Sequence, residues 1–212
     1  MSAYLTVKDK AERLEVIERS KFICKLFHVE DEEEAKGYIE LVKKEHSLAT
    51  HNCYAYVADD KGLVQKFSDD GEPQGTAGLP MLNALKAQGL KKTLAIVTRY
   101  FGGIKLGTGG LARAYGGAVT ECAKQAEIVN MHPVLVLEAK TDYDEYSKLN
   151  NLIMRLNLPV LDTAFDNGVT VKFVLKLENE GSEKQFLDKL LDLFKGKDII
   201  SKKLYDYYAF KV

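Results

Sequence analysis

The chain has 212 residues, 46% of them hydrophobic, which is enough to bury a core in one large domain or two ordinary ones. Its 30 basic and 31 acidic residues give a net charge of -1, which excludes a uniformly basic nucleic-acid coat but not a local basic patch. No apolar run approaches the ~20 residues of a membrane span, and the first residues lack the apolar segment of a secretory signal.

The first half of the chain predicts an α+β domain. Alternating apolar residues predict strands, and apolar residues three or four apart predict helices. The strands are expected at 13–29 (two strands around a turn at Glu18–Ser20), 53–58, 63–67 and 93–101, the last of them central in its sheet. The helices are expected at 31–45, where Asp31 provides the cap, at 80–88, where Pro80 lies in the first turn, and from near Thr108, its N-cap, to Ala126. The buried stripe predicted for the last helix consists of Leu111, Tyr115, Ala118, Cys122 and Ala126.

The second half follows a boundary near Met131–Pro133, so the predicted domains are 1–132 and 133–212. Strands are expected at 134–140, 160–165, 169–177 and 199–210, and helices at 142–156 and 182–194. This order, βαββαβ, is the ferredoxin-like arrangement. Ser182 and Gln185 have the spacing of a capping box for the last helix. The predicted fold class is therefore α+β in two domains.

The glycine loop, residues 99–117 (RYFGGIKLGTGGLARAYGG), joins the strand at 93–101 to the following helix. Glycines at such a junction let backbone N–H groups approach an anion closely, and Arg99, Lys105 and Arg113 would add positive charge. GTGGLA satisfies the relaxed dinucleotide pattern GxGxxA, but the order GxxxxGK[ST] is absent. Two interpretations stay open: an anion or partner site, and tight packing of strand against helix.

The acidic loop, residues 68–80 (SDDGEPQGTAGLP), places Asp69, Asp70 and Glu72 within four positions. Three carboxylates could hold Mg²⁺ or act as general acid and base. A structured recognition loop is favoured, because glycine, aspartate and proline all shape turns. We expect this loop to pack beside the glycine loop, with Arg99 or Lys105 neutralising Asp69 or Asp70.

The three cysteines, Cys24, Cys53 and Cys122, lack CxxC spacing, which suits buried thiols in a reducing cytoplasm. His51 and Cys53 share one face of a strand and could begin a metal or nucleophile site, but a buried cysteine beside an edge histidine is favoured. Aromatic residues on strands, such as Tyr100 and Phe101, can stack on unpaired RNA bases, yet they are also ordinary strand formers.

Four segments together resemble the IMPACT family in its bacterial YigZ/YvyE branch: SKFI at 20–23, the strand at 52–55, the acidic loop and the glycine loop. The resemblance implies a first domain similar to the fourth domain of elongation factor G and to a small-subunit ribosomal protein. It implies a second domain similar to the ferredoxin-like fifth domain of that factor. Eukaryotic relatives restrain a starvation-activated kinase of translation initiation by competing for its scaffold protein, whereas the bacterial members have no settled activity.

From these observations we expect a non-enzymatic, cytoplasmic regulatory or binding protein without a cofactor. Its partner is expected to be RNA or the ribosome, by analogy with the elongation-factor domains, and no membrane is expected. A protein–protein adaptor and a metal-assisted hydrolase using the acidic loop remain as alternatives, and the oligomeric state is left open. The predicted partner-binding residues are Asp69, Asp70, Glu72, Thr76, Arg99, Tyr100, Gly102, Gly103, Lys105, Gly107, Gly110 and Arg113.

Overall fold

The structure is a computed structural model that describes residues 2–210, and it confirms the α+β class. The chain divides into two compact units. The N-terminal unit is Tyr4–Asn130, and the C-terminal unit contains the chain from Met131 onward. Each unit has its own antiparallel sheet and its own hydrophobic core. Among the described residues, no helix combines the length and the apolar character that crossing a bilayer requires.

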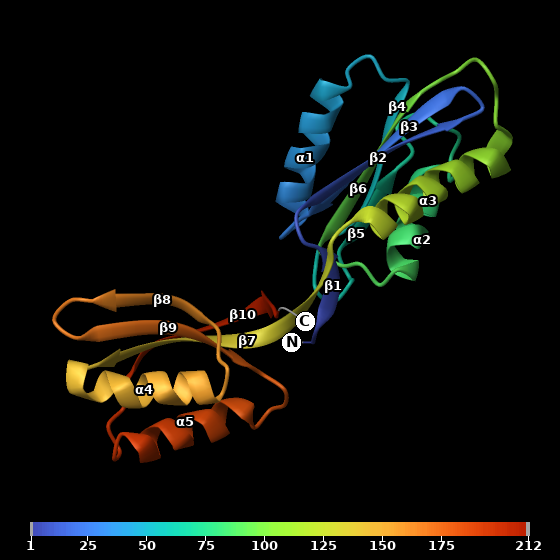
Figure 1. Cartoon of the computed structure of the whole chain (residues 1–212). Helices are drawn as coiled ribbons and strands as arrows, with labels where there is room; N and C mark the ends of the chain where they lie inside the picture. The colour runs from blue at the N-terminus through green and yellow to red at the C-terminus, as the bar shows by residue number, and fades with distance from the viewer. Residues whose placement is uncertain (1, 211–212) are drawn as a thin grey trace. The chain divides into compact units, whose positions relative to one another are not determined.

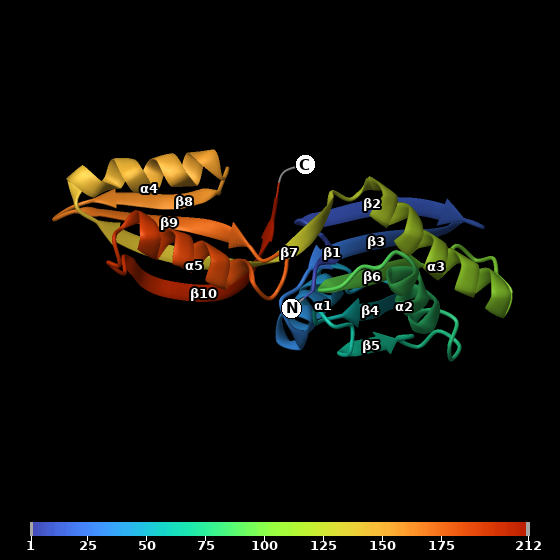
Figure 2. The same cartoon turned by 90° about the horizontal axis from the view of Figure 1, so that it is seen from below.

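The N-terminal unit is built on a sheet with the order β2-β3-β6-β4-β5, which can be followed in Figure 2. The strands of this sheet are β2 (Lys10–Ile17), β3 (Ser20–His28), β4 (His51–Val57), β5 (Gln65–Ser68) and β6 (Thr93–Tyr100). The first strand, β1 (Tyr4–Val7), pairs instead with β7 (Ile128–Thr141). The helices of the unit are α1 (Glu32–Glu45), α2 (Gly78–Ala87) and α3 (Gly107–Gln125). One face of the sheet carries α1 and the other carries α2 and α3 (Figure 1). The central place predicted for the strand at 93–101 is confirmed, while β1 was not predicted.

The apolar pattern of each element explains this layering. In β6, Ala95 and Val97 pack toward α2 and α3, whereas Leu94 and Ile96 pack toward α1. Because both faces of β6 are covered, its sequence reads as a nearly continuous apolar run. The α1 helix begins where the carboxylate of Asp31 accepts the N–H of Glu34 at 2.9 Å, as predicted.

The predicted apolar stripe of α3 is also confirmed. The core that α2, α3 and the sheet share buries Leu111, Tyr115, Ala118 and Cys122. These residues recur every three or four positions, so one face of the helix meets the sheet along its length. The glycine loop is thereby anchored at its downstream end by a helix whose inner face is packed against the sheet.

The C-terminal unit has the strand order β10-β7-β9-β8 with α4 and α5 on one face of the sheet (Figure 1), which is the predicted ferredoxin-like arrangement. Its elements are β7 (Ile128–Thr141), α4 (Tyr143–Arg155), β8 (Val160–Phe165), β9 (Val169–Lys176), α5 (Ser182–Leu193) and β10 (Ile200–Ala209). The two units divide between Asn130 and Met131, close to the predicted boundary at Met131–Pro133, and β7 runs through this division. Pro133 has no N–H to donate, but its carbonyl accepts the N–H of Leu177 at 3.0 Å.

Two predicted helix caps are also wrong. Thr108 lies inside α3, which begins at Gly107 after Leu106, without a capping side chain. In α5 the cap position is Gly181, and the hydroxyl of Ser182 accepts the N–H groups of the preceding loop instead of capping the helix. At Ser182 the residue type therefore indicated the right place for the helix start, but hydrogen bonds to the preceding loop occupy its hydroxyl.

Candidate functional site

Asp69 organises the acidic loop from within. Its carboxylate accepts the N–H of Gly75 at 2.8 Å, of Ala77 at 3.0 Å and of Gly78 at 2.8 Å. Burial by itself raises the pKa of Asp69, but the three N–H donors outweigh burial and hold the pKa below its ordinary value. Asp69 thereby satisfies the free N–H groups where α2 begins. This explains why the helix starts at Gly78, whereas the sequence predicted a start at Pro80.

Asp70 ties the acidic loop to α1 and β4. Its carboxylate pairs with the ammonium group of Lys43 at 2.8 Å and accepts the N–H of Asn52 at 2.7 Å. Its carbonyl oxygen accepts a hydrogen bond from Nδ1 of His51 at 2.8 Å. Asp70 also adopts a positive φ of 45°, a conformation that aspartate tolerates better than most residues. Both oxygens of this carboxylate are therefore occupied by other parts of the chain.

Glu72 joins the acidic loop to the glycine loop. Its side chain is only 3% exposed, and Oε1 accepts hydrogen bonds from Arg99 at 2.7 Å and from the hydroxyl of Tyr115 at 2.8 Å. The two loops thus lie side by side. The predicted ion pairs of Asp69 or Asp70 with Arg99 or Lys105 are wrong, because Glu72 is the carboxylate that the backbone turns toward the interior.

Arg99 is a structural cation. It is 5% exposed, and its second terminal nitrogen donates to the hydroxyl of Ser20 at 3.3 Å. The guanidinium carbon lies 5.4 Å from the ring centre of Phe22 and 5.3 Å from that of Phe101, so both rings are within the distance of a cation–π interaction. These contacts place the charge of Arg99 out of reach of an external ligand.

Gly102 brings the glycine loop against the turn between β2 and β3. Its N–H donates to the hydroxyl of Ser20 at 3.2 Å. A Cβ at this position would lie 2.1 Å from the carbonyl carbon of Arg19, closer than atoms approach without a shift of the backbone. The packing interpretation of the glycine loop therefore holds for its first part.

The second part of the glycine loop faces outward. Lys105 and Arg113 are exposed and border a hollow of about 430 Å³, together with Glu18 and Gly110. At this hollow α3 begins at Gly107, whose φ of +71° favours glycine. The first N–H groups of α3 have no side-chain cap, and the N-terminus of a helix attracts anions.

The predicted partner-binding residues therefore separate into two groups. One group of side chains has hydrogen-bond or ion-pair partners within the N-terminal unit, although Tyr100 stays partly exposed; these residues are Asp69, Asp70, Glu72, Thr76, Arg99 and Tyr100. Thr76, for example, is 6% exposed and donates to the carbonyl of Pro73 at 2.6 Å. Gly102 is held by packing. The positions left at the surface are Gly103, Lys105, Gly107, Gly110 and Arg113.

Cys53 is fully buried, and its thiol donates to the carbonyl of Asp69 at 2.9 Å. Burial raises the pKa of Cys53 to about 12, so at neutral pH the side chain remains a thiol and is a poor nucleophile. Burial also raises the pKa of the neighbouring Tyr115 phenol well above its ordinary value. Within residues 2–210, no group of three or more histidine, cysteine or acidic side chains is arranged to hold a metal ion.

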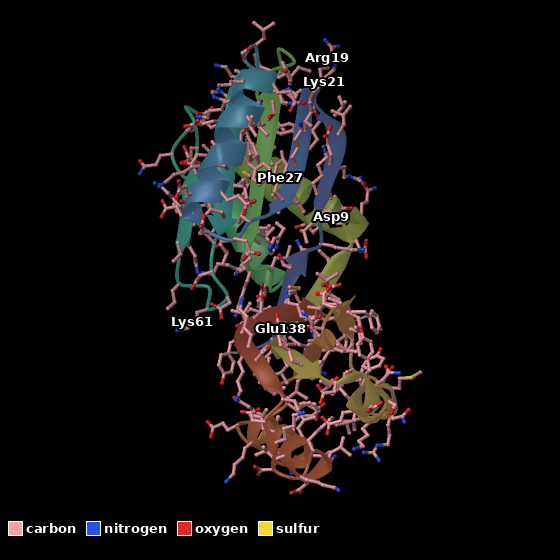
Figure 3. All side chains as sticks on the ribbon, turned by 90° about the vertical axis from the view of Figure 1, so that its left-hand side faces the viewer. Asp9, Arg19, Lys21, Phe27, Lys61 and Glu138 are labelled. Atoms are coloured by element: carbon pink, nitrogen blue, oxygen red, sulfur yellow. The ribbon has the colours of Figure 1, made fainter. Side chains whose placement is uncertain are left out.

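The sequence analysis missed a second hollow, of about 360 Å³, on the same unit. It is bordered by Leu14, Arg19, Lys21, Ile23, Tyr100 and Phe101. Arg19 and Lys21 stand at one end of the sheet, where the chain turns from β2 into β3 (Figure 3). The segment RSK at 19–21, placed at the tip of a predicted hairpin, was the available signal.

Fold and site together define a class: a two-unit α+β protein in which a buried glutamate–arginine pair joins an acidic loop to a glycine loop. The Impact N-terminal domain matches residues 18–123, which contain both loops. IMPACT family member YvyE of Bacillus subtilis is 49% identical over 151 residues, covering 71% of this chain and 70% of that protein. IMPACT family member YigZ of Escherichia coli is 34% identical over 198 residues, covering 92% and 96%.

The similarity extends to a solved structure. A crystal structure of a protein described as hypothetical has a TM-score of 0.64 and 32% sequence identity, and the match covers 100% of this chain and 98% of that one. The chain therefore belongs to the IMPACT family, as its two loops predicted.

Proposed function

We propose that this IMPACT family protein is a non-enzymatic regulator that binds RNA, with phosphate groups contacting Lys105 and Arg113 at the start of α3. One observation carries the proposal. The carboxylates of the acidic loop are bound by partners within the chain, whereas the two exposed cations border a hollow beside an uncapped helix N-terminus. Phosphate is the anion that such a combination of backbone N–H groups and point charges accommodates.

The contacts of the three carboxylates in the acidic loop argue against the hydrolase alternative. A magnesium site needs carboxylate oxygens that are free to coordinate the ion. Here Glu72 is committed to Arg99 and Tyr115, Asp70 to Lys43 and the β4 backbone, and Asp69 to the start of α2. A metal ion would have to displace these partners, one of which is itself a buried cation.

A filter-binding titration of the full chain against ribosomes and a structured RNA tests the proposal. Lys105→Ala with Arg113→Ala is expected to weaken binding and to reduce the slope of log K against log[salt] by about 2, one for each lost phosphate contact.

The matched control is Lys44→Ala with Lys61→Ala. Both lysines are exposed in the same unit, and Figure 3 shows Lys61 at the opposite end of the sheet from Arg19. The control is expected to bind like the unmodified chain. The proposal is refuted if neither the ribosome nor the structured RNA binds, or if both double variants lose affinity equally. Salt-tolerant capture of a protein without RNA would favour the adaptor alternative.

A further inference from the structure

The turn between β2 and β3 separates two hollows of the N-terminal unit. Glu18 borders the hollow that contains Lys105 and Arg113. The next residue, Arg19, borders the second hollow, which is also lined by Phe101. Both turn residues have positive φ, 46° and 62°, so the tip is a tight two-residue connection. A polymer that lies across this tip would reach both hollows at once.

The aromatic rings of the second hollow are held in place by the buried network. Phe101 is 46% exposed, with the guanidinium of Arg99 near one side of its ring and its N–H donating to the hydroxyl of Thr50 at 3.0 Å. The hydroxyl of Tyr100 shares a hydrogen bond of 3.0 Å with Nδ1 of His46. Rings that are already ordered lose little conformational entropy when a ligand stacks on them.

The chemistry of the second hollow combines flat apolar surface with positive charge. Its aromatic and aliphatic side chains come from three strands and the residue after β6, and its two charged side chains, Arg19 and Lys21, are both basic. A volume of about 360 Å³ lies within the range of small-molecule sites. An unpaired nucleotide offers a planar base for the rings and a phosphate for the cations.

We propose that Tyr100 and Phe101, flanked by Arg19 and Lys21, form a stacking platform for an unpaired base of the bound RNA. This inference rests on the proposed function, because the neighbouring phosphates are those that contact Lys105 and Arg113. The protein therefore prefers RNA in which a single-stranded segment adjoins a paired one, and a fully paired RNA engages only the first hollow.

Fluorescence anisotropy with two labelled RNAs tests the platform. One RNA is a blunt duplex, and the other is a shorter duplex with a single-stranded overhang and the same number of phosphates. The full chain is expected to bind the overhang RNA about tenfold more tightly, the effect of one stacked base. Phe101→Ala abolishes this preference and leaves duplex binding unchanged, whereas Phe101→Trp retains it. The matched control is Phe165→Ala, which removes an exposed aromatic side chain of the C-terminal unit.

The two RNAs distinguish failure of the platform from failure of the proposed function. Equal affinity of the unmodified chain for both RNAs, or an equal loss for both in Phe101→Ala, overturns the platform while duplex binding still supports the phosphate site. Binding of neither RNA overturns both. An acidic aromatic peptide that binds in a Phe101-dependent manner, while RNA binding is independent of Phe101, assigns the second hollow to a protein partner and also overturns the platform. Melting temperatures of the variants confirm that each is folded.

Discussion

Replacing Glu72 by alanine is expected to destabilise the N-terminal unit by about 3 kcal/mol. The Glu72 and Arg99 side chains are 3% and 6% exposed, so the change leaves a buried guanidinium without its carboxylate. Removing one partner of such a pair costs roughly 3–5 kcal/mol. We take the lower end because the hydroxyl of Ser20 and the ring of Phe22 still contact Arg99. The hydroxyl of Tyr115 also loses its acceptor.

The loss can be measured by urea unfolding of the full chain, followed by far-UV circular dichroism because the chain has no tryptophan. About 3 kcal/mol corresponds to a fall in melting temperature on the order of 10 °C for a unit of this size. The control is Glu121→Ala, which removes an exposed ion pair with Lys124 and should cost no more than about 0.5 kcal/mol.

A double-mutant cycle isolates the pair. Glu72→Leu combined with Arg99→Met removes both charges, and it is expected to be more stable than the sum of the single changes implies, because neither charge is left buried alone. A loss below about 1 kcal/mol for Glu72→Ala, or strictly additive effects in the cycle, would show that the pair does not hold the two loops together.

Three further predictions concern single positions. Asp69→Ala should lower the free energy of unfolding by about 1–2 kcal/mol at pH 7. Because folding lowers the pKa of Asp69, the greater stability of the unmodified chain should be complete above about pH 4 and vanish as the pH falls through that lowered pKa. Urea titrations of both chains at several pH values measure this difference. Gly102→Ala should lower the melting temperature, because its Cβ collides with the backbone of Arg19, whereas Gly117→Ala, where no atom lies within 4 Å, should raise stability by up to about 1 kcal/mol. Cys53 should resist iodoacetamide at pH 8 in the native chain and react after unfolding, as peptide mass mapping would show; rapid native labelling would contradict its burial.

Local sequence patterns predicted much of the fold because the relevant interactions act within one turn or one strand. The cap at Asp31, the stripe from Leu111 to Cys122 and the apolar run of β6 each follow from side chains a few positions apart. The order of elements in the second half was sufficient for the ferredoxin-like arrangement. The two glycine-rich loops also pointed to the IMPACT family, because their spacing and composition are unusual for surface turns.

The structure brings the two predicted loops together, but it pairs their charged residues differently from the prediction. The sequence shows three carboxylates and several cations without saying which pair forms. Arg99 meets Glu72 across 27 positions of the chain, and Gly102 meets Ser20 across 82. No local pattern predicted the ion pair between Lys43 of α1 and Asp70. Long-range contacts of this kind depend on how the strands pair, so they could not be read from local patterns.

The amino-acid sequence by itself determined the family, the α+β class and the neighbourhood in which charge and glycine gather. Only the tertiary structure decided that the acidic side chains point inward, that Lys105 and Arg113 stay at the surface, and that the turn at Arg19 brings a second hollow beside the first. The reason is that periodicity fixes which face of each element is apolar. The direction in which a loop side chain points is fixed by whichever distant backbone and charges pack against it.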